Sequence, residues 1–196
     1  MQHAIDHLSA ADPVLAAVID MVGPYTFTPG SHGFRTLVDA IVSQQISVKA
    51  AAAIMGRLEA LLGETTPARV LEVTPEELRA VGISGQKARY LRDLAERATL
   101  GVLDLSALPS LDDDTVIAQL TAVKGIGRWT AEIYLLFALG RPDILPAEDL
   151  GLRVAAQQFY DLPEPPKPAE LRRMGEAWRP YRSVASWYLW RGRHML

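Results

Sequence analysis

Apolar residues recur at intervals of three and four along most of the chain, which is the spacing of amphipathic helices. No run of residues shows the sustained alternation of apolar and polar positions that a half-buried strand would need. The sequence therefore predicts an all-α fold. The expected helices span 12–22, 34–48 with a continuation that could reach 62, 67–72, 75–81, 84–101, 105–108, 112–122, 129–139, 149–159, 168–175 and 181–191.

Helix-capping residues support several of these boundaries. Thr74 is followed by a proline and two glutamates, which is favoured at a helix start because side-chain oxygens satisfy backbone amides and carboxylates face the positive end of the helix dipole. Asp112 is followed by two further aspartates, so a second helix is expected to start there. The segment 162–168 contains four prolines, so we expect a surface connection there.

A chain of 196 residues can bury one core or two small lobes that share a cleft. We expect one functional unit over residues 1–196, with one helical lobe at about 35–110 and the other formed by about 1–34 together with about 111–196. No apolar run is long enough to span a membrane, and residues 1–12 lack the pattern of a secretory signal. We therefore expect a cytoplasmic monomer without a membrane partner.

Cysteine is absent from the sequence, which excludes disulfides, thiolate catalysis, iron–sulfur clusters and cysteine-bound zinc. The four histidines show no spacing typical of metal ligands. A metal-dependent hydrolase is therefore not expected, and we expect catalysis to need no cofactor.

Charge is unevenly distributed along the chain. The net charge is −3, but residues 170–196 contain six arginines and two glutamates, a local net charge of +4. A basic face on an acidic protein can bind a polyanion such as DNA, although a solvated helix face would have the same composition.

The segment 120–134 is the most informative one, with the sequence LTAVKGIGRWTAEIY. A helix is expected to end there at a turn with glycines at 125 and 127, and a second helix follows directly. Amides left uncovered by glycines, together with a helix N-terminus, can bind a phosphate oxygen. An ordinary tight connection between helices would show the same pattern, so both interpretations are open at this point.

Asp149 stands twenty residues after Trp129, behind a loop that contains Pro146 and at the start of the expected helix 149–159. Aspartate is a common N-cap residue, so a purely structural role is possible. An N-cap position also fixes a carboxylate at a helix end and keeps it ionised. Capping and catalysis are therefore compatible at this residue.

With VKGIGRWTA at 123–131, Pro146 and Asp149, the sequence resembles the helix-hairpin-helix DNA glycosylase superfamily, and within it the bacterial 3-methyladenine DNA glycosylase II type. The similarity extends to IVSQQIS at 41–47, GISGQKA at 82–88 and WRPYRSVA at 178–185. The resemblance implies a base-excision-repair enzyme. It would flip an alkylated base, such as 3-methyladenine or 7-methylguanine, out of double-stranded DNA and hydrolyse its N-glycosidic bond.

The resemblance also implies roles for individual residues. Asp149 would be the catalytic carboxylate that stabilises a sugar cation, and Gln45 would enter the gap that the flipped base leaves. The base pocket would include Trp129, Trp190, Ile133 and Leu150. The DNA would be bound by Gln44, Gln45, Ser47, Gly125, Gly127, Arg128, Thr130 and Arg182. A structural sodium or potassium ion would be held by the backbone carbonyls of Thr121, Val123 and Ile126.

The sequence departs from the family pattern in several places. The larger bacterial members carry an additional N-terminal β-rich domain, which we do not expect here because there is no room for it before residue 13. Gln45 replaces a common apolar wedge, Leu150 replaces an aromatic residue and Ile133 replaces a tyrosine. We therefore expect a less aromatic base pocket.

A single aspartate suffices for this chemistry, because N3- and N7-alkylated purines are already cationic and leave without a strong general acid. Family members with lyase activity carry a lysine where this chain has Trp129, so we expect a monofunctional glycosylase. Two alternatives are a glycosylase of the same fold for other damaged or mispaired bases, and a non-enzymatic helix-hairpin-helix module that only binds DNA. The second would need neither Asp149 nor aromatic walls.

Overall fold

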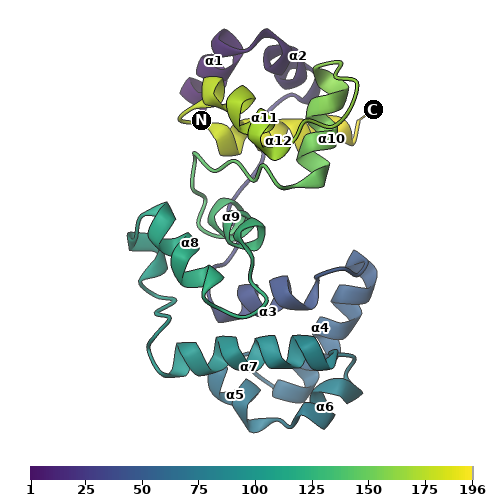
Figure 1. The fold of residues 1–196 in the computed structure, drawn as a ribbon, viewed down its shortest axis with the longest axis vertical. Coiled ribbons are helices and arrows are strands. Elements are labelled where there is room, and N and C mark those ends of the chain that lie inside the picture. Colours follow the sequence, from purple (N-terminus) through teal and green to yellow (C-terminus); the bar gives the residue numbers. More distant parts are fainter. Residues whose placement is uncertain (196) are drawn as a thin grey trace. The chain divides into compact units, whose positions relative to one another are not determined.

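The structure, a computed structural model, describes residues 1–195. Every regular element in this range is a helix, which confirms the all-α prediction. None of these helices is long and apolar enough to cross a bilayer. The chain divides into two compact units (Figure 1): a terminal unit, Met1–Gly30 with Leu135–Leu196, and a middle unit, Ser31–Tyr134. The sequence-based division grouped residues 111–134 with the terminal segments, whereas here they belong to the middle unit.

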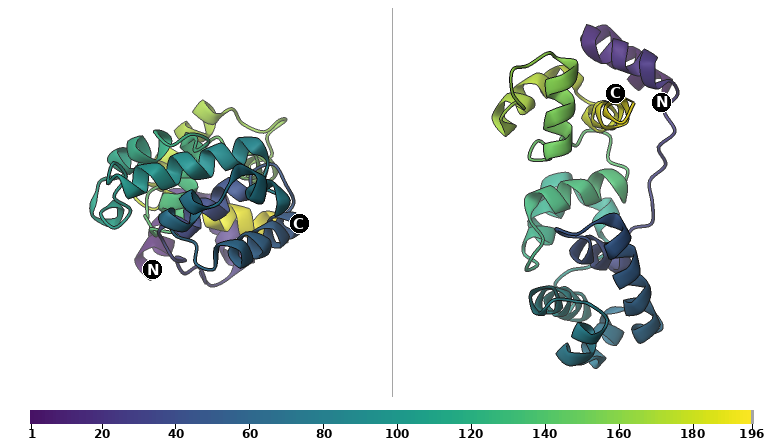
Figure 2. Two further views of the ribbon diagram at one scale, coloured as in Figure 1. Left: turned by 90° about the horizontal axis from the view of Figure 1, so that it is seen from below. Right: turned by 90° about the vertical axis from the view of Figure 1, so that its right-hand side faces the viewer.

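The terminal unit brings the two ends of the chain together. Helix α2 (Pro13–Val22) packs against α1 (Gln2–Ala11) and against α12 (Arg182–Arg193), and the purple and yellow ribbons of these helices can be followed in Figure 2. Helix α10 (Leu150–Phe159) also packs against α12. Along the chain between α10 and α12, helix α11 (Pro168–Met174) leads into the 3-10 helix η2 (Gly175–Trp178). The shared core includes Leu8, Leu15, Leu152, Trp178 and Tyr188.

Helix α7 (Gly85–Thr99) is central to the middle unit. It contacts α3 (Phe34–Val42), α5 (Pro67–Glu72) and α6 (Pro75–Ala80), and α4 (Val48–Leu62) packs against α3. The 3-10 helix η1 (Leu108–Ser110) precedes α8 (Asp113–Thr121). Helix α9 (Arg128–Phe137) completes a helical hairpin with α8 and continues into the terminal unit.

Three parts of the helix prediction are wrong. The helix expected over 34–48 ends at Val42, because Gln45 adopts a left-handed conformation (φ 57°) and Ser47 caps a new helix by accepting the Ala50 amide. Residues 105–107 form turns instead of a helix. Helix α1 is missing from the prediction because only two of its ten residues are buried, which leaves almost no apolar periodicity.

Asp12 links the N-terminal segment to two later elements of the terminal unit. Its Oδ1 accepts the amides of Val14 and Leu15 at 3.0 and 3.1 Å and thereby caps α2. Its Oδ2 accepts the Tyr160 hydroxyl at 2.5 Å and the Trp178 indole N–H at 2.8 Å. Burial and the neighbouring carboxylate raise the pKa of the Tyr160 hydroxyl, so it remains a donor at neutral pH.

We predict that Asp12→Ala lowers the free energy of unfolding by about 3 kcal/mol, since it removes an N-cap and leaves two side-chain donors without their acceptor. Asp112→Ala is a matched control, because it removes an exposed N-cap of α8 and should lower the same quantity clearly less. Urea denaturation measures both changes. Equal losses in the two variants would contradict this role of Asp12.

Candidate functional site

Asp149 is the N-cap residue of α10, as the sequence predicted, with φ −65° and ψ 118°. Its Oδ1 accepts the Leu152 amide at 2.6 Å, which is the capping bond. The same oxygen accepts the indole N–H of Trp190, from α12, at 2.9 Å. Donors from two different helices therefore fix the orientation of this half-buried carboxylate.

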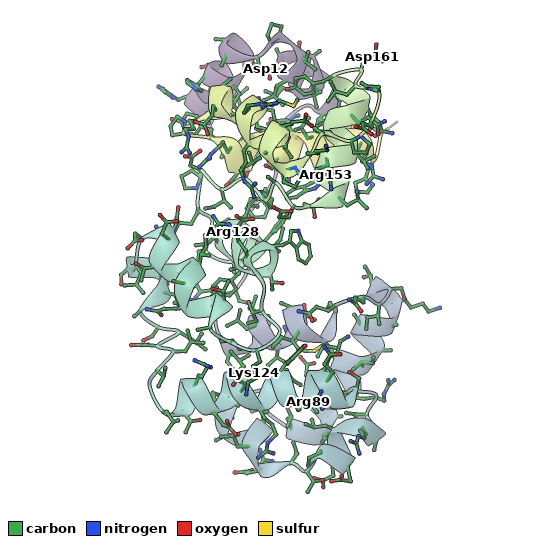
Figure 3. All side chains as sticks on the ribbon, in the orientation of Figure 1. Asp12, Arg89, Lys124, Arg128, Arg153 and Asp161 are labelled. Carbon is green, nitrogen blue, oxygen red and sulfur yellow. The ribbon has the colours of Figure 1, made fainter. Side chains whose placement is uncertain are left out.

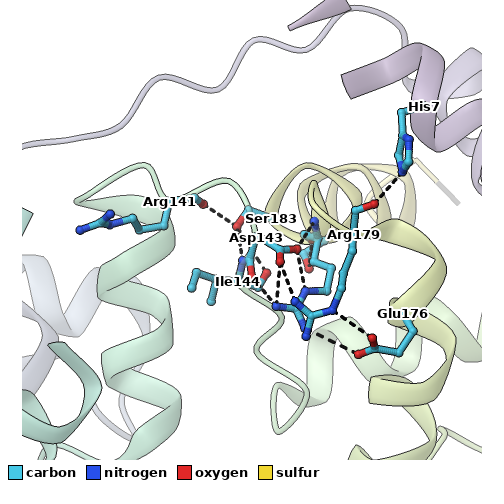
Figure 4. A network of polar contacts seen from close by, with 9 residues as sticks. His7, Arg141, Asp143, Ile144, Glu176, Arg179 and Ser183 are labelled. Carbon is cyan, nitrogen blue, oxygen red and sulfur yellow. Dashed lines mark hydrogen bonds and ion pairs between the residues drawn. The ribbon is translucent and has the colours of Figure 1, made fainter. Parts of the chain in front are cut away.

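The loop that leads to Asp149 is anchored to the first turn of α12 (Figure 4). The Ser183 hydroxyl accepts the Ile144 amide at 2.9 Å. The Asp143 carboxylate accepts Nε of Arg182 at 2.7 Å, and the Asp143 backbone carbonyl accepts Nη2 at 2.7 Å. Helix α12 therefore holds the loop at both ends. Arg182 and Ser183 bind the start of the loop, and Trp190 binds the Asp149 carboxylate at its end.

Trp190 belongs to an aromatic cluster in the terminal unit. Its ring is stacked on Phe137, with centroids 5.6 Å apart and planes at 29°, and Phe137 meets the ring of Phe27 edge-on at 5.4 Å. Phe137 is 37% exposed, and Leu150, the residue after Asp149, is 63% exposed. Sequence reasoning identified Trp190 and Leu150 but missed Phe137, because an aromatic residue at the end of a helix carries no distinctive signal.

A side chain at position 151 would crowd the carboxylate of Asp149. A Cβ on Gly151 would lie 3.1 Å from Oδ1 of Asp149, so the carboxylate would have to shift by a few tenths of an ångström, whereas the distance of 3.7 Å to Nε1 of Trp190 is an ordinary van der Waals contact. The same point lies 3.6 Å from Nη1 of Arg193, so a cationic group is near the carboxylate as well. Neither Gly151 nor Arg193 could be singled out from the sequence.

The hairpin turn between α8 and α9 requires a glycine at position 125 and leaves the space around Gly127 open. Gly125 has φ +82°, and a Cβ there would fall 2.1 Å from the ring of Tyr90. Around Gly127, by contrast, no atom of the described residues other than its own and those of its chain neighbours lies within 4 Å of the corresponding point. A ligand can therefore approach the backbone closely at Gly127.

The predicted site residues on α9 differ in exposure. The Arg128 side chain is 57% exposed and donates from Nε to Glu132 at 2.8 Å, and Trp129 is 42% exposed. Ile133 is half-buried. Thr130 is only 7% exposed, so Arg128 and Trp129 have the most accessible side chains among the predicted residues of α9.

Gln44, Gln45 and Ser47 lie in the turn between α3 and α4, and only Gln44 is half-buried. The Gln44 side chain donates from Nε2 to the Gly125 carbonyl at 2.8 Å, and the Ser47 hydroxyl caps α4. Gln45 is exposed and makes no side-chain hydrogen bond to any described residue. Of the three, Gln45 therefore has the side chain that an incoming ligand can meet.

The three residues predicted to hold a cation, Thr121, Val123 and Ile126, flank the hairpin turn. The Val123 carbonyl accepts the Ile126 amide at 3.1 Å. Among residues 1–195, no three acidic or histidine side chains are grouped so that they could hold a metal ion.

Most of the basic C-terminal segment is neutralised by acidic partners. Arg172 pairs with Glu148 at 2.9 Å, and Arg182 pairs with Asp143 at 2.7 Å. Arg179 also pairs with Asp143, at 2.8 Å (Figure 4). The Arg182 side chain, predicted to bind DNA, is only 17% exposed, so the structure shows it as an anchor of the Asp149 loop. The sequence did not reveal this pairing because both acidic partners lie outside the basic segment.

Known proteins share the sequence pattern and the fold of this chain. Residues 38–180 match the family model of the HhH-GPD superfamily of base excision DNA repair proteins. A crystal structure of DNA-3-methyladenine glycosidase from Bacillus halodurans is 40% identical, with a TM-score of 0.87 over 95% of this chain and 87% of that chain. The 3-methyladenine DNA glycosylase of Schizosaccharomyces pombe, solved in complex with abasic DNA, is 33% identical, with a TM-score of 0.87 over 96% of this chain and 95% of its own.

The chain therefore belongs to the HhH-GPD superfamily of base excision DNA repair proteins. The expected likeness to the bacterial glycosylase II type is confirmed, since Escherichia coli DNA-3-methyladenine glycosylase 2 is 32% identical over 168 residues, covering 80% of this chain and 56% of that protein.

Proposed function

We propose that this protein is a base-excision-repair DNA glycosylase that hydrolyses the N-glycosidic bond of alkylated bases in double-stranded DNA. The observation that carries the proposal is the oriented carboxylate of Asp149, held by Leu152 and Trp190 beside stacked aromatic rings. It occurs in a chain whose superfamily acts in base excision repair.

The Asp149 carboxylate would act on the sugar of the flipped nucleotide. When the bond between the anomeric carbon and the base nitrogen breaks, its electron pair leaves with the cationic base, which becomes neutral. Positive charge then develops on the sugar, and a preoriented carboxylate stabilises it most in the transition state. Water adds to the anomeric carbon and its proton passes to the carboxylate, which leaves an abasic site in an intact strand.

Alkylated purines suit the aromatic surroundings of this carboxylate. Flipping a base out of the duplex takes a few kcal/mol, and less for damaged or mispaired bases. Stacking and cation–π attraction recover roughly 1–3 kcal/mol when an electron-poor base meets an aromatic face. Trp190 and Phe137 offer such faces, and Trp129, Ile133 and Leu150 are further candidates for contact with the base.

We propose that the protein is a cytoplasmic monomer and that it binds DNA with damaged bases through the backbone of the hairpin turn. We also propose that catalysis needs no cofactor. We propose that the backbone carbonyls of Thr121, Val123 and Ile126 hold a structural sodium or potassium ion, and the Val123 carbonyl keeps a second lone pair for it after accepting the Ile126 amide. Such an ion would add positive charge beside the bound phosphate.

An excision assay on a panel of duplexes tests the proposal. We expect release of 3-methyladenine and 7-methylguanine, and much slower release of oxidised or mispaired bases. Preferential release of oxidised or mispaired bases would identify a glycosylase of the same fold with another specificity. DNA binding without release of any base would identify a non-enzymatic module.

We predict that the enzyme leaves the abasic strand uncut and that borohydride traps no covalent complex with lesion DNA. A lyase needs an amine that forms a Schiff base with the sugar. The Lys87 amine donates to the carbonyls of Val42 and Gln44, and the Lys124 amine lies 3.4 Å from Asp93. A trapped complex that disappears in Lys87→Ala or Lys124→Ala would contradict the prediction.

A further inference from the structure

Three side chains of α7 contact two turns of the middle unit: the hairpin turn, to which the proposed function assigns DNA binding, and the turn whose Gln45 is expected to enter the DNA. Lys87, Tyr90 and Asp93 are spaced three residues apart, so they lie on one side of the helix. One of the two turns, residues 43–47, carries Gln45. The other is the hairpin turn, residues 122–127. A single rigid helix therefore contacts both.

Lys87 is bonded to the turn that carries Gln45. Its Nζ donates to the backbone carbonyls of Val42 at 2.6 Å and Gln44 at 2.8 Å, on either side of the point where α3 ends. Carbonyls at a helix C-terminus lack partners within the helix, and an ammonium is favourable at this end of the dipole. Burial lowers the pKa of Lys87, which is the expected effect of removing an ammonium from water.

The turn that Lys87 holds is in an unfavourable conformation. Gln45 has φ +57°, in the left-handed region that residues other than glycine rarely occupy. Such a conformation persists only when its surroundings impose it. Lys87 restrains this turn from another helix, with one bond to Gln44 inside the turn and one to Val42, the residue that precedes it.

The hairpin turn is held by the other two side chains of α7. The Tyr90 ring occupies the place where any side chain at Gly125 would have to be. The Asp93 carboxylate accepts the backbone amide of Lys124 at 2.9 Å. Gln44 then joins the two turns directly, because its side chain donates to the Gly125 carbonyl at 2.8 Å.

We propose that Lys87 is a positioning residue that fixes the turn of Gln45 in register with the hairpin turn, so that insertion of Gln45 into DNA and phosphate binding occur at a set spacing. The inference rests on the proposed function, and it concerns the step in which the base leaves the duplex. A wedge held in place before DNA binds needs no ordering at the moment of insertion, which speeds the step that depends on it.

Lys87→Met tests the inference, because it keeps the length of the side chain and removes the ammonium. We expect amide hydrogen exchange in residues 43–47 to rise about tenfold in this variant, with little change elsewhere in the middle unit. Single-turnover excision should slow roughly tenfold, while affinity for undamaged duplex changes less than about twofold. In a Gln45→Ala background the same substitution should slow excision less than about twofold, because the residue that Lys87 positions is already gone.

Arg89→Met is the matched control, since Arg89 is an exposed cation on the same helix (Figure 3) and its side chain forms no hydrogen bond or ion pair with any described residue. It should leave both exchange and excision unchanged. Unchanged exchange in residues 43–47 of Lys87→Met would overturn the inference, and so would an equal slowing with and without Gln45. If Lys87→Met fails to fold, Gln44→Leu takes its place, because it removes the hydrogen bond that joins the two turns directly. Its effect on excision is then compared with and without Gln45→Ala in the same way. A wild-type protein that releases no base would refute the proposed function and leave the exchange result to decide the role of Lys87.

Discussion

Replacing Asp149 with asparagine is expected to slow base excision at least about a hundredfold and to leave DNA binding nearly intact. The substitution removes the charge that stabilises the sugar cation. It keeps the shape of the side chain and an oxygen that can still accept the Leu152 amide and the Trp190 indole N–H. Single-turnover excision and a binding titration with lesion duplex measure the two quantities separately.

Glu148→Gln is the matched control for this prediction. Glu148 is the neighbouring carboxylate in the same loop, and it forms an exposed ion pair with Arg172. This variant should excise at close to the wild-type rate. If Asp149→Asn retained more than about a tenth of the wild-type rate, the loss of transition-state stabilisation would be below ~1.4 kcal/mol, and the catalytic assignment would be wrong.

Trp190→Phe should have the second-largest effect. It keeps an aromatic face against Phe137 but removes the N–H that donates to Asp149, and a hydrogen bond to a charged group contributes about 1.5–3 kcal/mol. We therefore expect the single-turnover rate to fall roughly tenfold or more, with affinity for lesion duplex changed only slightly. A slower rate with unchanged affinity indicates that Trp190 orients the carboxylate, whereas a loss of affinity indicates that it stacks on the base.

Trp187→Phe is the control on the same helix. Trp187 is 7% exposed and packs on Tyr25, with ring centroids 4.6 Å apart. This variant should lose stability but excise at the wild-type rate at temperatures where it is folded. If Trp190→Phe weakened lesion binding as much as it slowed excision, Trp190 would act mainly as a wall of the base pocket.

Much of the fold could be predicted from the sequence because its signals are local. Thr74 and Asp112 cap helices where they were expected to, since an N-cap depends only on residues three positions further on. The position of Asp149 at the start of α10 was predictable for the same reason. Helix α1 was not, because its stability comes from packing on α2 rather than from a pattern of its own.

The contacts that orient the candidate site could not be predicted, because they join residues far apart in the chain. Trp190 could be singled out as an aromatic side chain, but its bond to Asp149 spans 41 positions. Arg182 was counted as a cation for DNA, yet its partner Asp143 lies 39 positions away and binds it to the loop. The bonds of Lys87 to Val42 and to the turn of Gln45 depend on how α7 packs against α3.

The release of free bases from methylated duplex DNA tests the central claim most directly. We predict that the wild-type protein releases 3-methyladenine and 7-methylguanine as free bases, detected by chromatography, and leaves abasic sites in uncut strands. A protein that binds this DNA and releases neither base would contradict the account.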